Sequence, residues 1–122
     1  GCTCENQRRA DERLPLFLAA PIKHRMIVCE PLLEELDIKS YLSPALVESV
    51  SAGGESGSGA RLCRFEWIKR ISADCAAAGV AFSYHQTGAL LEVNGRMWRI
   101  PRRLQAEQAK RAGVDVCGTQ KE

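Results

Sequence analysis

The sequence predicts an α/β fold of parallel strands and helices, followed by a β-hairpin and a final helix. Short apolar runs alternate with helical segments over residues 1–85. Strands that alternate with helices pair in parallel through right-handed crossovers. After them, the dipeptide Asn94-Gly95 separates two alternating apolar runs, which is a strong signal for a hairpin turn.

Composition limits the class of protein. The 122 residues are 45% hydrophobic and 26% charged, which fits one globular domain over 1–116 and excludes intrinsic disorder. No apolar run approaches the roughly 20 residues of a membrane helix. The polar start lacks a signal peptide, so we expect a cytoplasmic protein. A net charge of +2 does not indicate a strongly electrostatic partner.

The first strand–helix unit occupies the N-terminus. Residues 1–5 are strand-like, and Asn6 is placed to cap a helix over 7–13. Pro15 is expected to begin a second short turn through 16–18, since proline is tolerated at helix starts.

The second unit begins with a strand at residues 26–29, which Pro31 ends. Its continuous apolar character suits a strand covered on both faces. Residues 32–46 predict short helical turns with a buried side formed by Leu33, Leu36, Ile38, Leu42 and Leu46.

A third strand is predicted at residues 49–52, with a loop over 55–59 after it. The strongest helical pattern follows at 64–78, and Gly79 is placed to end that helix. Its buried side is predicted from helical spacing to include Ile68, Ile71 and Cys75.

A fourth strand at residues 80–85 completes the alternating part of the chain. The hairpin spans 89–100, and a helix over 102–112 is closed by Gly113. Residues 117–122 are expected to form a flexible tail.

Polar side chains stand where the predicted strands end, which is where parallel α/β folds bind ligands. We expect a small-ligand site formed by Glu5, Glu30, Gly53, Gly54, Glu55, Ser56, His85 and Gln86. Clustered carboxylates suit Mg²⁺ or another divalent ion. The plainer interpretation is that each glutamate caps the next helix and that the glycines form a tight turn.

A basic stretch near the C-terminus offers a second candidate surface. Arginines beside an exposed aromatic side chain can hold a nucleic-acid backbone and stack a base. The alternative is that Met97 and Ile100 anchor the hairpin while the arginines remain solvated or pair with Glu92 and Glu107. The candidate nucleic-acid residues are Arg96, Trp98, Arg99, Arg102 and Arg103, with Lys110 and Arg111 adding positive charge.

The six cysteines predict no conventional metal site, because no two of them have the C-x₂-C spacing of a zinc or cluster knuckle. We favour buried, reduced thiols. The alternative is a cluster of Cys2, Cys4 and Cys29 that binds a soft metal or reacts with oxidants.

Five ordered motifs carry a family resemblance: Glu5-Asn6-Gln7, Cys29-Glu30-Pro31-Leu32-Leu33, Gly53-Gly54-Glu55-Ser56-Gly57, Gln86-Thr87-Gly88 and Ile100-Pro101-Arg102-Arg103-Leu104-Gln105. Up to about Val116, the chain resembles a phage-associated bacterial family of unknown function. Full-length members look like radical-SAM-type barrels with a three-cysteine iron–sulfur motif in the N-terminal half. This chain lacks that motif, so the resemblance implies the C-terminal half of a (β/α) barrel.

The resemblance implies no iron–sulfur cluster in this chain and no radical SAM reaction by the chain alone. It also implies that the strand ends of this half retain a site for a nucleoside cofactor or substrate. The candidate ligand-binding residues of that site are Glu5, Glu30, Glu55 and Gln86. No complete catalytic motif is present, so whether the chain is an enzyme stays open.

We therefore expect an uncharacterised protein of mobile-element or phage type that acts as a small-ligand binding module, with a nucleotide-like molecule as the ligand. The alternatives are a metal-dependent enzyme acting on phosphoesters through the glutamate rim, and a nucleic-acid-associated protein. A half-barrel exposes two strand edges and an apolar inner face, so we also expect a homodimer that covers them.

Overall fold

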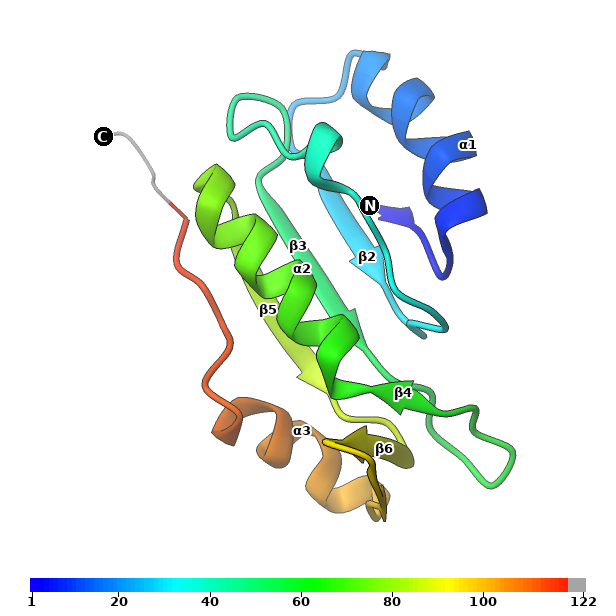
Figure 1. Cartoon of the computed structure of the whole chain (residues 1–122). Helices are drawn as coiled ribbons and strands as arrows, with labels where there is room; N and C mark the ends of the chain where they lie inside the picture. The colour runs from blue at the N-terminus through cyan, green and yellow to red at the C-terminus, as the bar shows by residue number, and fades with distance from the viewer. Residues whose placement is uncertain (119–122) are drawn as a thin grey trace.

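The computed structural model describes residues 1–118, and at its centre is a four-stranded sheet in the order β1-β2-β3-β5 (Figure 1). All three strand pairs are parallel, which confirms the predicted α/β fold. The described strands form an open sheet and do not close into a barrel. The strands are β1 (Cys2–Thr3), β2 (Met26–Cys29), β3 (Ser49–Gly53) and β5 (Ala81–Gln86).

Helix α1 (Gln7–Ala19) begins where the sequence predicts and extends further. The Asn6 side chain caps it by accepting a hydrogen bond of 2.9 Å from the Arg9 amide. The predicted break at Pro15 is wrong, since Pro15 lies inside one continuous helix. The reason is packing: Leu14 before the proline and Leu18 after it both contact the same core, and this burial outweighs the backbone hydrogen bond that proline cannot make.

The segment between β2 and β3 contains little helix. Its one helical turn in the described chain is the 3₁₀ helix η1 (Lys39–Tyr41). The predicted buried side is right for Leu36, Ile38 and Leu42 and wrong for two positions: Leu33 is half-buried and Leu46 is exposed. Without a regular helix, periodic spacing does not determine which side chains point inward.

Helix α2 (Phe65–Ala78) confirms the strongest helical prediction. Ile68, Ile71 and Cys75 are buried as expected, and the helix ends at Gly79 in the left-handed conformation.

A second sheet in the order β4-β6-β7 stands beside the carboxyl end of β5. The predicted hairpin is confirmed as β6 (Leu90–Val93) and β7 (Arg96–Arg99). Both turn residues, Asn94 and Gly95, have positive φ, as a type I′ turn requires. Sequence reasoning missed β4 (Cys63–Arg64), which is two residues long and runs directly into α2. Helix α3 (Arg102–Arg111) confirms the last helix and packs on β5.

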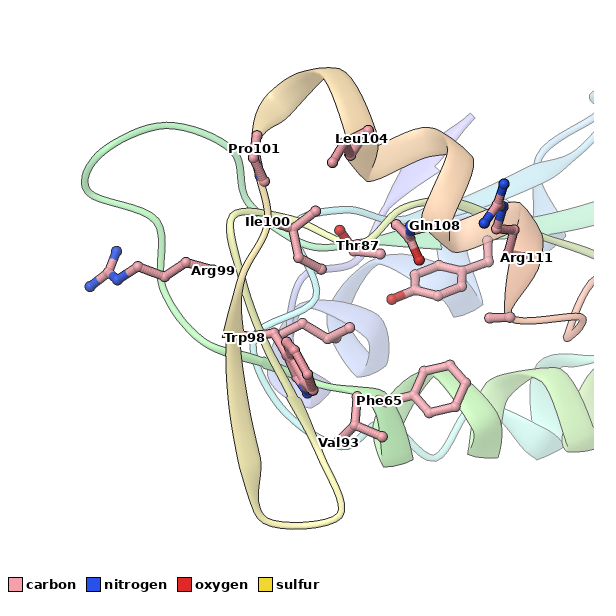
Figure 2. A pocket seen from close by; sticks show the side chains of 13 residues that line it. Phe65, Thr87, Val93, Trp98, Arg99, Ile100, Pro101, Leu104, Gln108 and Arg111 are labelled. Atoms are coloured by element: carbon pink, nitrogen blue, oxygen red, sulfur yellow. The ribbon is translucent and has the colours of Figure 1, made fainter.

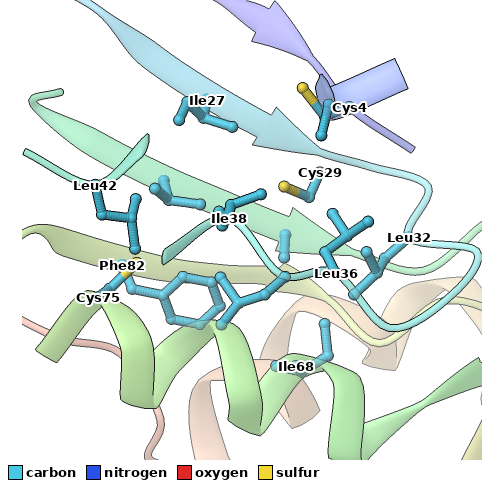
Figure 3. Packing of buried hydrophobic residues seen from close by; sticks show 14 of the residues in the cluster. Cys4, Ile27, Cys29, Leu32, Leu36, Ile38, Leu42, Ile68, Cys75 and Phe82 are labelled. Atoms are coloured by element: carbon cyan, nitrogen blue, oxygen red, sulfur yellow. The ribbon is translucent and has the colours of Figure 1, made fainter. Parts of the chain in front are cut away.

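The hydrophobic core lies on one face of the parallel sheet. Figure 3 shows Ile27, Cys29 and Phe82 between the strands and α2, where they pack with Leu36 and Ile68. One buried cluster includes side chains from the sheet, α1, α2 and the segment around η1.

The opposite face of the sheet is open, so the prediction that β2 is covered on both faces is wrong. Met26 on that face is 47% exposed. Strand alternation places Val28, Ser51 and Ser83 on the same face. The expected apolar inner face is also wrong, because small and polar side chains share this surface with Met26 and Val28.

The last described residues run along β5. Val116 and Phe82 exchange two backbone hydrogen bonds of 2.9 Å, so part of the outer edge of the sheet is paired. Residues 119–122 of the predicted tail lie outside the described residues. Within residues 1–118, no helix combines the length and apolar character needed to cross a bilayer.

Candidate functional site

The carboxyl ends of β2, β3 and β5 bring together Glu30 and His85. The imidazole Nδ1 of His85 lies 2.9 Å from one Glu30 carboxylate oxygen and 3.2 Å from the other. These residues come from strands that flank β3, and Gly53 makes their meeting possible: a Cβ there would lie 3.0 Å from the Glu30 carboxyl carbon. The absence of a side chain on β3 therefore lets a carboxylate and an imidazole meet across it.

A strand irregularity exposes His85. Tyr84 pairs with Ala52 and Gln86 pairs with Gly53, so His85 has no partner on β3. Bulges of this kind redirect side chains beside functional sites. The His85 side chain is 66% exposed and available to a ligand.

Gln86 belongs to a second cluster that joins the strand ends to α3. Its amide nitrogen donates to the Gly54 carbonyl and to the Ser56 hydroxyl, both at 3.0 Å. Ser56 donates to the Gln105 side-chain oxygen at 2.8 Å, and Gln105 donates to the Ile100 carbonyl at 2.9 Å. These hydrogen bonds link the loop after β3 to α3 and so help to position the carboxyl ends of the strands.

The loops after β3 and β5 touch through two glycines. A Cβ at Gly54 would collide with the Thr87 carbonyl oxygen and lie 2.9 Å from the Gly88 Cα. Gly88 also has a φ of +81°, which disfavours other residues. Sequence reasoning placed Gly54 in a ligand site and did not predict its close backbone contact with Gly88.

The other two glutamates turn toward arginines. Glu5 lies 3.2 Å from the Arg13 guanidinium. Glu55 accepts two side-chain hydrogen bonds from Arg61, at 3.0 and 2.9 Å, and one from its backbone amide at 2.9 Å. These hydrogen bonds from Arg61 lower the pKa of Glu55 from 4.5 to about 2.

Beside His85, a cavity of about 560 Å³ opens between β5 and α3. Among its lining residues, the sequence prediction assigned only His85 to this site; the polar residues that it missed are Ser83, Tyr84, Glu107, Lys110, Arg111 and Asp115. Ser83 could have been predicted from its spacing to His85 on one strand, since residues two apart share a face. Lys110 and Arg111 join the site only because α3 packs on β5, which no local pattern encodes.

The predicted carboxylate cluster is divided among separate partners. Glu5, Glu30 and Glu55 each face a different basic or imidazole side chain. Across residues 1–118, no group of three or more His, Cys, Asp or Glu side chains is arranged to hold a metal ion.

The basic hairpin is exposed along all of β7. The Arg96 guanidinium lies 4.6 Å from the centre of the Trp98 ring, a cation–π contact. The interpretation that Met97 anchors the hairpin is wrong, since Met97 is 59% exposed. Glu92 pairs with Arg64 at 3.6 Å instead of with a hairpin arginine.

All six cysteines are free thiols, and five are buried, as expected. The sulfurs of Cys2 and Cys4 lie 3.9 Å apart in the interior. Burial raises the pKa of Cys4, Cys63 and Cys75 to about 12. Such thiols contribute little thiolate at neutral pH.

Comparison with known proteins shows a similarity to an uncharacterised family. A family model described as "Protein of unknown function (DUF5131)" matches residues 1–121. No curated protein and no solved structure matches the chain significantly.

Proposed function

Because the chain belongs to the DUF5131 family of proteins of unknown function, we propose a function for it from the geometry of its site. The chain is a binding module, and its ligand is a small, nucleotide-like molecule held at the carboxyl ends of β2, β3 and β5. The observation that carries the proposal is the Glu30–His85 pair beside a cavity with basic residues.

The two ends of this site suit different parts of a nucleotide. The Glu30 carboxylate is a hydrogen-bond acceptor suited to sugar hydroxyls. Lys110 and Arg111 line the cavity with His85, and their nitrogens are donors suited to phosphate oxygens. Two acidic residues also line it: Glu107 lies 4.0 Å from Arg111, and Asp115 accepts a hydrogen bond from the Tyr84 amide. Ser83 adds a hydroxyl in the same cavity. A molecule with a sugar and a phosphate therefore complements the surface better than a purely apolar one.

The test uses adenosine 5′-monophosphate, with adenosine and inorganic phosphate as separate probes. We expect the monophosphate to raise the Tm by about 4 °C when its concentration is roughly tenfold above its Kd. Adenosine and phosphate alone should each give a smaller shift. In isothermal titration, Glu30→Gln and Lys110→Gln should each weaken the affinity for the monophosphate by about tenfold, because each variant removes one charged contact.

The chain provides a matched control at the other end of the sheet. His24 and Glu48 form an exposed pair at 2.8 Å, near the amino ends of β2 and β3. His24→Gln should leave binding unchanged, whereas His85→Gln should reduce it. The proposal fails if the monophosphate neither stabilises the chain nor releases heat at millimolar concentration.

A metal-dependent phosphoesterase is the alternative at the same residues. It is supported by a carboxylate and an imidazole that already lie within 2.9 Å of each other, since both are metal ligands. Titration with Mg²⁺ and Mn²⁺ distinguishes the phosphoesterase from the binding module. Metal binding abolished by Glu30→Gln, with turnover of a phosphodiester, would favour the enzyme over the binding module.

A nucleic-acid partner is a second candidate and would use the hairpin instead. Trp98 is partly exposed beneath Arg96, a combination that can stack a base. Filter binding at low salt tests it: Trp98→Ala and Arg99→Gln should each reduce retention of single-stranded DNA. Retention at background level for the unchanged chain would exclude this candidate.

The proposed module derives from a larger enzyme of a phage-associated family. We propose that full-length members of the family are radical-SAM-type barrels and that this chain corresponds to their C-terminal half. The consecutive order of the parallel strands supports a barrel origin, because neighbouring strands in a (β/α) barrel are consecutive in sequence. The buried, unpaired thiols support a reducing, cytoplasmic location. Anaerobic reconstitution of a full-length relative tests this origin by its iron content.

A further inference from the structure

A second cavity, of about 530 Å³, lies among the start of α2, the hairpin and α3. Its walls are mostly apolar and include the aromatic rings of Phe65 and Trp98. Tyr84 also lines it, and Tyr84 and His85 are adjacent on β5, so their side chains leave opposite faces of the sheet. This cavity therefore does not include the Glu30–His85 pair, although Tyr84 and Arg111 also line the cavity beside His85.

The hydroxyl of Tyr84 is an unsatisfied polar group in this apolar surrounding. Tyr84 is only 3% exposed, and its hydroxyl oxygen has no hydrogen-bond partner among the described residues. A buried polar group without a partner is costly, and such groups are uncommon in folded proteins. Burial raises the pKa of Tyr84 above its ordinary value, so the group remains a neutral phenol that can donate a hydrogen bond.

The other lining side chains define the shape and polarity of an occupant. Figure 2 shows Trp98, Val93 and Phe65 on one side and Thr87 and Gln108 on the other. The Arg99 side chain points away from these residues in Figure 2 and supplies no charge to the interior. Flat aromatic walls favour a flat aromatic occupant. Arg111 also lines the cavity, but its side chain is 70% exposed and lies 4.0 Å from the Glu107 carboxylate, so a neutral occupant is favoured.

We propose that this cavity binds a neutral, planar aromatic molecule that carries a hydrogen-bond acceptor, with the acceptor bonded to the Tyr84 hydroxyl. The ring lies between the side formed by Trp98 and Phe65 and the opposite side formed by Thr87 and Gln108 (Figure 2). Gln108 stands at the opening and offers an amide to a second polar atom of the ligand. Tyr84 and Arg111 line both this cavity and the one beside His85, but this proposal does not use Glu30, His85 or Lys110, so either proposal can fail without the other.

The test compares two probes of nearly the same shape, isoquinoline and naphthalene, which differ by one ring nitrogen that accepts a hydrogen bond. In ¹H–¹⁵N NMR titrations, isoquinoline should shift the amides of Thr87, Leu91 and Trp98. Its Kd should be on the order of 0.1–1 mM, as suits a ligand of this size. It should also bind about fivefold to tenfold more tightly than naphthalene, because only isoquinoline satisfies the phenol.

Tyr84→Phe removes only the hydroxyl oxygen. It should weaken isoquinoline binding by about fivefold to tenfold and leave naphthalene binding unchanged. Its Tm should be equal to or above that of the unchanged chain, since an unsatisfied group is lost. Tyr41→Phe is the matched control: Tyr41 hydrogen bonds to Asp11 on the surface, and its replacement should alter neither affinity.

Two results would overturn the proposal. One is the absence of shifts at these amides with millimolar isoquinoline. The other is equal affinity of the unchanged chain for isoquinoline and naphthalene. The comparison of isoquinoline with naphthalene on the unchanged chain needs no variant, so it remains decisive if Tyr84→Phe does not fold.

Discussion

At the scale of single residues, the thiol of Cys117 is exposed, whereas the other five thiols lie in the interior. The thiolate is the reactive form, and burial both hides these thiols and raises the pKa of Cys4, Cys63 and Cys75 to about 12. Native protein treated with a maleimide at about pH 8 should therefore gain one label quickly, and denatured protein should gain six. Mass spectrometry counts the labels. Rapid modification of Cys2, Cys4 or Cys29 in native protein would contradict the buried core.

The Glu55–Arg61 pair makes a prediction about acid titration. Hydrogen bonds from Arg61 lower the pKa of Glu55 from 4.5 to about 2. Because the folded-state pKa is the lower one, the pair contributes to stability at neutral pH and loses that contribution as the pH falls from 4.5 toward 2. Arg61→Gln should raise the pKa of Glu55 toward 4.5, observed by ¹³C NMR of the carboxyl carbon. An unchanged titration curve would show that another group holds the carboxylate ionised.

At the scale of elements, the loops after β3 and β5 depend on the contact between Gly54 and Gly88. Gly54→Ala should lower the free energy of unfolding by about 2–3 kcal/mol, because the new methyl group meets fixed backbone atoms. Gly59 lies in the same loop and has open space around it. Gly59→Ala is therefore the control and should change the free energy of unfolding by less than about 0.5 kcal/mol. Urea denaturation measures both, and equal stability of the two variants would contradict the predicted clash.

The elements themselves were largely predictable. The hairpin follows from Asn94-Gly95 and the end of α2 from Gly79, because each depends on backbone angles within a few residues. The extension of α1 through Pro15 was not predictable in this way. It depends on apolar contacts that form after the helix packs against the core. The free energy of these contacts outweighs the tendency of proline to end a helix.

At the scale of the whole molecule, we propose that the chain forms a homodimer through the amino-end part of the open face, around Met26, and the free edge of β1, which leaves the ligand site at the carboxyl ends uncovered. Met26 is exposed there beside Val28, and exposed edges invite pairing. Light scattering at micromolar concentration should give twice the 13.4 kDa mass of one chain. Met26→Lys should shift the mass toward the monomer, whereas Leu16→Lys on the outer surface of α1 should not. A monomer for the unchanged chain would refute the proposal.

The sequence by itself determined the alternation of strands and helices, the hairpin and the placement of polar residues at the strand ends, because these arise from neighbouring residues and from the period of apolar side chains. Only the tertiary structure decided which of those polar residues meet. Glu5 and Glu55 face arginines, while Glu30 reaches His85 across Gly53. Such partners depend on strand order, on register and on the packing of α3 against β5, all of which are fixed by contacts between segments far apart in the chain.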